Sequence, residues 1–539
     1  MKFVAAILAD LETTPLGTRS RLADDLVGTP VLRRTVQRVL AARCFSSVHV
    51  LAPLDQAAAV ARLLDGLPVQ HERHVGTRSP HAELVRAGRW WGLDGWRGGI
   101  GSMCVFDEDV HIALLAALVE QTGADAVIPV PAAAAVADPA LLDAIAGHFE
   151  GLGESARITI VQAPPGLAAV VLGRVLLQEM LSSNLPPGAL LTYHPDQPAP
   201  DGTGKEICHR PAAEVIEARG RLLCDTRRGF ERVADLLADG GEAWPAARIG
   251  AWLMERHRRR VEAVPEEIEI ELTTDDPDGD SVLLRPRGVA VGRRGPIELD
   301  AIARIAEAVA GYDDVRIVLG GFGEPCRHPR FAEICRALRR SAASLAVRTN
   351  GTAADPAVED VLFETPVDVI EVTLDAATPE TYRRVYGMDR FGEVSARLER
   401  WIARRASSQR VRPLIVPSLV KALETFDDLE PFYDTWQRRL GAVLVTGYSH
   451  CARQRPDRAV TSTAPPHREP CRRVRSRALI LADGRMTTCD QDFAGRQAVG
   501  RVGDQDFAAL WHGVGLEAVR RETVAHGPLC GSCDEWHRP

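Results

Sequence analysis

Short apolar segments alternate with longer helix-periodic segments along most of this chain. Near the start, apolar runs at 3–8 and 48–52 alternate with helical patterns at 31–42 and 57–67. Such alternation is typical of βαβ units, which build a mostly parallel sheet. The pattern recurs at 126–130, 139–149 and 157–161. We therefore predict an α/β fold.

A second series of predicted strands begins at residue 267, with helical patterns between its members. These strands are expected at 267–272, 315–319, 345–348, 367–374 and 413–416. Parallel strands at this spacing indicate an open or partial (β/α) barrel.

The length of 539 residues exceeds what one hydrophobic core supports, since domains average roughly 150 residues. We expect an α/β domain at 1–237, a helical linker at 238–265 and a partial barrel at 266–450. A change of texture after about residue 447, where Pro, Arg and Cys become more frequent, predicts a small cysteine-rich domain at 451–539.

The composition is that of an ordinary globular protein, with 45% hydrophobic and 26% charged residues and a net charge of -8. It fits neither a basic nucleic-acid-binding protein nor a disordered acidic segment. No apolar stretch approaches the roughly 18 residues of a membrane span, and no cleavage pattern follows the first apolar run. With an odd number of cysteines, most of them scattered, we expect a cytoplasmic protein.

Four of the late cysteines form an ordered array. Cys471, Cys489, Cys530 and Cys533 follow a C-x17-C-x40-C-x2-C spacing. The last pair can grip one metal from a single turn, and a predicted hairpin at 478–488 brings the first pair together at its base. Four thiolates suit either a structural zinc or an iron–sulfur cluster, and the spacing alone does not choose between them.

The residues around this array resemble a SPASM domain. SPASM domains extend many radical S-adenosylmethionine (SAM) enzymes at the C-terminus and hold auxiliary 4Fe–4S clusters. The four cysteines resemble the single-cluster version, and Cys451 is a weaker fifth candidate. The elements that carry the resemblance are Pro470-Cys471, the run 481–490, the run 500–503, Leu510-Trp511 and Cys530-Gly531-Ser532-Cys533.

A glycine-rich run follows the predicted strand at 315–319 and resembles the Gly-Gly-Glu-Pro motif of the radical SAM core. That motif binds the amino group of SAM, so the resemblance implies a cofactor site. Later segments with Asn350, Thr373 and Asp375 occur in the order typical of the same family. The implied cofactor-binding residues are Gly320, Gly321, Gly323, Glu324, Pro325, Asn350, Thr373 and Asp375.

Radical SAM enzymes carry a C-x3-C-x2-C loop after the first barrel strand, and this chain lacks it. The corresponding loop at 275–281 reads Asp-Asp-Pro-Asp-Gly-Asp-Ser, and no cysteine lies between Cys224 and Cys326. Carboxylates prefer hard cations, so the loop is either an exposed acidic turn or a site for magnesium, calcium or manganese. We infer that reductive cleavage of SAM is lost, while a SAM pocket can survive.

The first 235 or so residues resemble a nucleotidyltransferase of the kind that activates sugars as CMP derivatives. The resemblance implies a Rossmann-like α/β domain with a nucleotide site at its first loop, where Arg19 and Arg21 can supply positive charge. The segments that carry it are the strand at 3–8, the loop at 11–22 and the runs 28–32, 137–143 and 221–226.

The departures from this family lie where its chemistry takes place. The position of its phosphate-binding lysine falls near Asp24, and that of its magnesium-binding aspartate falls at about Ala133. Asp107 and Asp109 form either an alternative metal site or a surface turn. A retained fold with altered or lost activity is favoured.

The whole arrangement resembles the spiro-SPASM type of protein. One hypothesis is a binding, scaffold or partner protein that holds one auxiliary 4Fe–4S cluster, with zinc as the alternative metal and SAM as a possible ligand. The other hypothesis is an enzyme, either a SAM-dependent radical enzyme with unusual core ligands or a cytidylyltransferase-like enzyme. A protein partner or a peptide or sugar substrate is expected, without nucleic acid.

Overall fold

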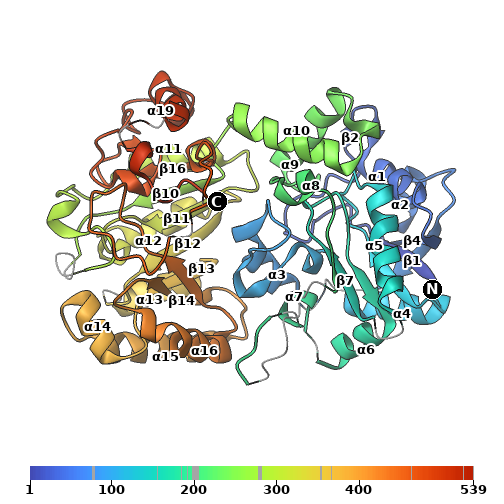
Figure 1. Cartoon of the computed structure of the whole chain (residues 1–539), viewed down its shortest axis with the longest axis horizontal. Coiled ribbons are helices and arrows are strands. Elements are labelled where there is room, and N and C mark those ends of the chain that lie inside the picture. The colour runs from blue at the N-terminus through green and yellow to red at the C-terminus, as the bar shows by residue number, and fades with distance from the viewer. Residues whose placement is uncertain are drawn as a thin grey trace. The chain divides into compact units, whose positions relative to one another are not determined.

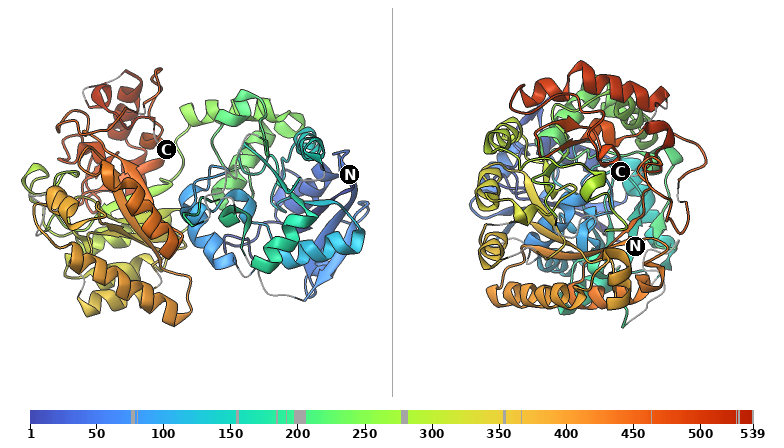
Figure 2. Two further views of the ribbon diagram at one scale, coloured as in Figure 1. Left: turned by 60° about the horizontal axis from the view of Figure 1, so that its bottom comes forward. Right: turned by 90° about the vertical axis from the view of Figure 1, so that its left-hand side faces the viewer.

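The computed structural model of this protein describes residues 1–75, 79, 81–153, 156–183, 185–190, 192–196, 206–276, 282–352, 355–365, 367–462, 464–525, 527 and 529–537. The chain divides into two compact units, Met1–His257 and Arg258–Pro539. Figures 1 and 2 show the strands of each unit enclosed by its own helices. No helix in the described ranges has the length and apolarity needed to cross a membrane.

The first unit contains a seven-stranded sheet in the order β5-β4-β1-β6-β8-β7-β9. Strands β5, β4, β1 and β6 run parallel, while β8 runs antiparallel to both β6 and β7. The strands are β1 (Phe3–Leu8), β4 (Phe45–Pro53), β5 (Gln70–His74), β6 (Ala126–Pro129), β7 (Ile158–Val161), β8 (Val171–Gly173) and β9 (Cys208–His209), and β2 (Asp25–Leu26) and β3 (Thr29–Pro30) pair separately.

One helix of this unit begins at a side-chain cap. The Asp138 carboxylate accepts a hydrogen bond from the Ala140 N–H, and Pro139 opens α5 (Pro139–Gly151). The other helices are α1 (Val31–Leu40), α2 (Ala57–Leu63), α3 (Ala82–Arg89), α4 (Ile112–Thr122), α6 (Arg174–Ser183), α7 (Pro187–Leu190), α8 (Ala213–Glu217), α9 (Arg227–Ala238) and α10 (Ala246–Arg259).

The second unit contains an eight-stranded sheet in the order β15-β14-β13-β12-β11-β10-β16-β17. Strands β10 to β15 run parallel and succeed one another in chain order, so each crossover returns to the neighbouring strand. The strands are β10 (Glu267–Glu271), β11 (Arg316–Gly320), β12 (Ser344–Thr349), β13 (Val369–Thr373), β14 (Leu414–Lys421), β15 (Leu444–Gly447), β16 (Arg477–Ile480) and β17 (Met486–Thr487).

Strand β10 alternates between two faces. Ile268 and Ile270 are fully buried in the core that also contains Ile302 of α11 and Ile334 of α12. The glutamates of β10 point to the other side, which we call the inner face of the second sheet. The helices of this unit are α11 (Leu299–Val309), α12 (Phe331–Leu338), α13 (Pro356–Glu364), α14 (Pro379–Tyr386), α15 (Phe391–Ser408), α16 (Leu429–Leu440), α17 (Arg473–Ser476), α18 (Phe507–Trp511) and α19 (Val514–Ala525).

The prediction of a mixed α/β protein with parallel sheets is confirmed. The predicted hairpin at 478–488 forms as β16 and β17, and its first strand pairs in parallel with β10. The cysteine-rich end of the chain therefore continues the second sheet through β16. Sequence periodicity did not indicate this pairing, because β10 and β16 are about two hundred residues apart.

Candidate functional sites

The glycine-rich run lies at the carboxyl end of β11, pressed against β10. A Cβ atom on Gly321, whose φ is +77°, would lie 2.5 Å from the Cβ of Glu271. A Cβ atom on Gly323 would lie 2.1 Å from the carbonyl oxygen of Thr273. Only glycine allows the loop to come this close to β10 and the residues after it. Gly321 and Gly323 therefore hold the carbonyl groups of the loop at the edge of the inner face.

Glu324 ties this loop to the end of β12. Its carboxylate is 1% exposed and accepts hydrogen bonds from the Asn350 N–H and the Thr349 hydroxyl, both at 2.8 Å. Pro325 follows it in a buried 3-10 turn, in which the Cys326 N–H also donates to Glu324. Burial raises the pKa of Glu324. The structure thus brings Glu324 and Asn350 together, as expected for parts of one site.

The side chain of Arg287 is hydrogen-bonded to carbonyl groups of the glycine-rich loop. Its guanidinium donates hydrogen bonds to the carbonyl oxygens of Gly321 at 2.9 Å and Gly323 at 3.2 Å. The same guanidinium lies 3.7 Å from the Asp276 carboxylate, whose side chain is 2% exposed. A fixed cation of the protein therefore already satisfies two of the predicted cofactor-binding residues.

The Asp375 carboxylate also has its ion-pair and hydrogen-bond partners within the protein. It has a φ of +52° and is completely buried, and its carboxylate forms an ion pair with Arg285. The Tyr386 hydroxyl and the Val420 N–H each donate to this carboxylate at 2.8 Å. The nearby Thr373 hydroxyl donates to the Thr349 carbonyl.

The inner face of the second sheet carries a ladder of ion pairs. Arg348 donates to Glu269 at 2.8 Å and to Glu371 at 2.9 Å, and Glu269 also accepts a hydrogen bond from the Gly321 N–H. Arg294 pairs with Glu271 through two hydrogen bonds. Alternating charges thus run from the glycine-rich loop across β10, β12 and β13.

The acidic loop after β10 is described only in part. Asp275 pairs with Arg327 at 2.6 Å and is exposed, whereas Asp276 is buried beside Arg287. Asp278 and Asp280 lie outside the described residues. Both described carboxylates therefore face arginines, which weakens the alternative of a hard-cation site.

The C-terminal cysteines gather around the hairpin and the last turn of the chain. All four are free thiols, and Cys471 lies close enough to Cys489 and Cys533 to raise the pKa of both, after burial, the main cause. Cys530 begins a short turn that ends at Ser532, directly before Cys533. Within the described part of the chain, no three His, Cys, Asp or Glu side chains converge tightly enough to hold a metal ion. The donor set suits a cluster, but its geometry is not that of a closed site.

Arg473 lies beside these cysteines. Its guanidinium is 3.3 Å from the Asp490 carboxylate, and its pKa is raised by Asp490, Cys489 and Cys471 against the effect of burial. Thiolates or a negatively charged cluster at this place would have a buried positive charge next to them.

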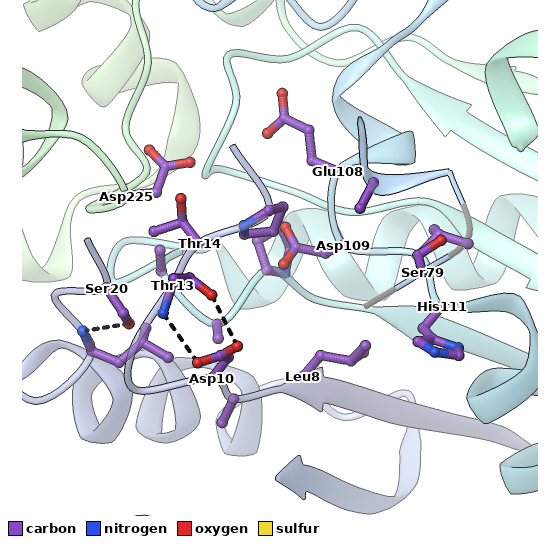
Figure 3. A pocket seen from close by; sticks show the side chains of 18 of the residues that line it. Leu8, Asp10, Thr13, Thr14, Ser20, Ser79, Glu108, Asp109, His111 and Asp225 are labelled. Carbon is purple, nitrogen blue, oxygen red and sulfur yellow. Dashed lines mark hydrogen bonds between the residues drawn. The ribbon is translucent and has the colours of Figure 1, made fainter. Parts of the chain in front are cut away.

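An acidic cavity of the first unit lies at the carboxyl ends of β1 and β6 (Figure 3). Its volume is about 150 Å³. The titratable side chains that line it are Asp10, His74, Asp107, Glu108, Asp109, His111 and Asp225. Ala132 and Ala133 form part of its wall. No lysine or arginine occurs among the described residues of the lining.

Neither predicted nucleotide-binding arginine lines this cavity. Arg19 forms a two-fold ion pair with Asp24 at 2.7 and 2.8 Å and is largely exposed. Arg21 donates to the carbonyl oxygens of Arg19 and Asp225. The structure keeps both arginines on the first loop, outside the cavity lining.

Two buried arginines that do not line the cavity neutralise some of its acidic side chains. Arg221 pairs with Glu108 at 2.5 Å and also with Asp225, and Arg89 pairs with Glu108 at 2.7 Å. Asp107 accepts hydrogen bonds from the Cys104 and Gly188 N–H groups, both at 2.7 Å. Asp107 and Glu108 are 3% and 6% exposed, so this segment is not the surface turn that was one alternative.

Asp109 differs from the other carboxylates of the cavity. It is partly buried and makes no hydrogen bond or ion pair with any described residue. Burial raises its pKa to about 8, and the neighbouring charges of Glu108 and Asp225 act in the same direction. At neutral pH this carboxyl group therefore holds a proton.

Sequence reasoning identified Asp107 and Asp109 as candidates but missed Asp10, Glu108 and His111. These residues come from segments about one hundred positions apart and follow no motif spacing. The available signal was their position directly after predicted strands or before helices, where the carboxyl ends of parallel strands meet. Arg285 and Arg287 carried no signal beyond their basic charge.

Comparison with known proteins identifies two parts of the second unit. A model of the radical SAM superfamily matches residues 285–407, and a model of the SPASM iron–sulfur cluster-binding domain matches residues 471–534. The second unit therefore contains segments that match a radical SAM domain and a SPASM domain, and domains of these two kinds indicate binding of 4Fe–4S clusters and SAM. The first match begins after the acidic loop that lacks the core cysteines.

Similar individual proteins cover different parts of the chain. An uncharacterized protein of Treponema pallidum is 27% identical over 308 residues, which is 53% of this chain and 83% of that protein. SuiB of Streptococcus suis, solved with its precursor peptide SuiA, is 11% identical with a TM-score of 0.39 and covers 57% of this chain and 82% of its own. A cytidylyltransferase of Leptospira borgpetersenii is 14% identical with a TM-score of 0.33, over 48% and 94% of the respective chains.

The raised pKa of Asp109 predicts a pH-dependent effect of Asp109→Asn on stability. The folded protein holds a proton on Asp109 that the unfolded chain releases above about pH 4. This contribution to stability is complete below that pH and is lost as the pH rises through about 8. We expect the variant to unfold at the same temperature as the parent near pH 4 and at a higher temperature above pH 8.

Thermal unfolding followed by circular dichroism over this pH range measures the difference. The control is Asp65→Asn, which removes an exposed carboxylate elsewhere in the first unit. A difference between Asp109→Asn and the parent that is the same at every pH would contradict the raised pKa.

Proposed function

We propose that this radical SAM/SPASM protein performs no radical chemistry and acts as a binding or scaffold protein with one auxiliary 4Fe–4S cluster. Cys471, Cys489, Cys530 and Cys533 would hold that cluster. The observation that carries the proposal is the pair of arginines at the mouth of the inner face, next to a loop without cysteine. Arg287 binds the Gly321 and Gly323 carbonyls, and Arg285 pairs with Asp375.

A core cluster does not fit the residues present. Three thiolates are needed after β10, and the sequence has no cysteine between Cys224 and Cys326. Cys326 itself is buried against Glu324, and burial raises its pKa well above the usual value. One inert thiol cannot replace three ligands.

A SAM molecule would compete with the guanidinium group of Arg287 for the carbonyl groups of the glycine-rich loop. In the resembled family the glycine-rich motif receives the positively charged amino group of SAM. Here the Arg287 guanidinium donates to the same carbonyl groups and is held by the buried Asp276. SAM binding would require the displacement of Arg287 and would leave a buried carboxylate without its partner, a change that costs about 3–5 kcal/mol.

The C-terminal array supports a single retained cluster. Four cysteine thiolates are the ligand set of a 4Fe–4S centre, and a cluster bound there would supply electron-transfer capacity or structural stability. Burial raises the pKa of Cys533 to about 12, so cluster or metal binding would release protons from these thiols. Zinc is the alternative occupant of the same four sulfur atoms.

A protein or peptide is the partner best supported by the surface of the second unit. Leu444 and Val445 on the edge strand β15 are each 38% exposed, and Leu423 and Phe426 beyond β14 are 63% and 52% exposed. Exposed apolar groups on and near a sheet edge favour association with another polypeptide.

Cytidylyl transfer by the first unit is less well supported. The cavity lining carries acidic groups and no described lysine or arginine, whereas a nucleoside triphosphate needs positive charge. Arg19 forms an ion pair with Asp24 and does not line the cavity.

The lost core chemistry predicts the result of a SAM cleavage assay. After anaerobic reconstitution with iron and sulfide, incubation with SAM and dithionite should yield no 5′-deoxyadenosine above the level of the reaction without protein. An active radical SAM enzyme assayed in parallel validates the reagents. Production of 5′-deoxyadenosine that depends on this protein would contradict the proposed function.

The four-cysteine site predicts the effect of replacing its ligands. The double variant Cys530→Ser and Cys533→Ser should lose the bound iron and acid-labile sulfide, because two of four thiolate ligands are absent. The variant Cys44→Ser, which changes a cysteine of the first unit, should keep both. Elemental analysis and the visible absorption of the reconstituted proteins provide the measurement. Zinc without iron in the parent protein, or iron retained by the double variant, would contradict the cluster assignment.

A further inference from the structure

The acidic cavity of the first unit lies where an α/β sheet binds ligands. From β1 the chain moves outward to β4 and β5, then returns to β6 on the other side of β1. The segments that leave β1 and β6 therefore diverge and open a crevice at the carboxyl ends of both strands. Leu8 to Asp10 and Pro131 to Ala133 line the cavity on these two sides.

Most of the acidic groups in the cavity already have a structural role. Glu108 and Asp225 are paired with buried arginines, and Asp107 binds backbone N–H groups. Asp10 accepts hydrogen bonds from the Glu12 and Thr13 N–H groups at 2.8 and 3.1 Å. In the view of Figure 3, Asp109 lies in the middle of the lining without such a partner.

The electrostatics of the cavity select the charge of a ligand. Among the described residues, the acidic groups outnumber the basic groups behind them. Burial and the influence of His111 lower the pKa of His74, so His74 adds no positive charge at neutral pH. An anion would meet repulsion here, whereas a cation would provide Asp109 with an ion-pair partner.

The remaining lining determines what kind of cation fits. No three potential metal-binding side chains in the described ranges are close enough together for a metal ion, so a bare divalent cation is not favoured. Leu8, Val85 and Leu114 provide an apolar wall, and the volume of about 150 Å³ holds roughly ten water molecules. A small organic cation uses both features.

We propose that this cavity binds a small amine, whose ammonium group pairs with Asp109 and whose carbon chain packs on the apolar wall of Leu8, Val85 and Leu114. The site is independent of the iron–sulfur and SAM regions of the second unit. It assigns to the first unit a ligand class opposite in charge to a nucleotide.

Binding should depend on pH, because the amine requires ionised Asp109. The free protein holds a proton on Asp109 below about pH 8, and this proton must leave when the ammonium group binds. Affinity should therefore rise by about tenfold per pH unit as the pH approaches 8. The other charged or titratable groups that face Asp109 or share its cavity are Asp10, His74, Asp107, Glu108, His111, Asp225 and Arg221.

Calorimetric titration of the full chain with putrescine tests the proposal. Putrescine stays protonated over the range from about pH 6.5 to 7.5, and 1,4-butanediol is its neutral counterpart. We expect saturable putrescine binding that tightens about tenfold over this range, and at least about tenfold weaker or undetectable binding to Asp109→Asn. Asp65→Asn should bind putrescine as the parent does.

Several results would overturn the proposal. Equal binding of 1,4-butanediol would show an apolar site without charge selection, and unchanged binding to Asp109→Asn would place the amine elsewhere. Binding of magnesium, or of CTP with magnesium, without putrescine binding would show a metal or nucleotide site. Absence of putrescine binding up to the millimolar range would also refute it. The pH dependence in the parent protein does not rely on the folding of any variant.

Discussion

The ion pairs on the inner face of the second sheet determine what this unit can do. Strand β10 directs Glu267, Glu269 and Glu271 to that face. Glu271 is buried and the other two are partly buried, so these carboxylates require positive charge beside them. Arg348 bridges Glu269 and Glu371, Arg294 holds Glu271, and Arg316 and Arg477 lie beside Glu267. Arg287 extends the same compensation to the glycine-rich loop. The proposed loss of core chemistry follows from these internal charge pairs, which occupy the inner face up to the glycine-rich loop.

In the first unit, buried arginines likewise neutralise carboxylates, here around the acidic cavity. Arg89 and Arg221 neutralise Glu108 and Asp225, and within the cavity Asp109 has no hydrogen-bond or ion-pair partner among the described residues. The chain has only three lysines, and arginine suits these places because its planar guanidinium binds carboxylates through two hydrogen bonds and keeps its charge when buried. The scarcity of lysine therefore accompanies a fold that depends on buried arginine.

The sequence predicted those parts of the structure that depend on local periodicity or on a motif. The strands β10 and β11 were expected from apolar alternation, and the glycine-rich loop from its residues, since a Cβ atom at Gly321 would clash with Glu271 of β10. The pairing of β16 with β10 and the cavity around Asp109 join segments that are far apart in the sequence, and no local pattern specifies which segments meet. Arg19 and Arg21 were chosen for their charge and their place in the first loop, and neither feature reveals that Arg19 already pairs with Asp24.

The most direct test locates the iron atoms in crystals of the anaerobically reconstituted protein by anomalous scattering at the iron edge. One group of iron atoms, bound by Cys471, Cys489, Cys530 and Cys533, is the predicted result, with the Arg287 guanidinium still on the Gly321 and Gly323 carbonyls. A second group of iron atoms beside the loop after β10, with Arg287 displaced from these carbonyls, would contradict the proposal that internal arginines have replaced the core cofactor chemistry.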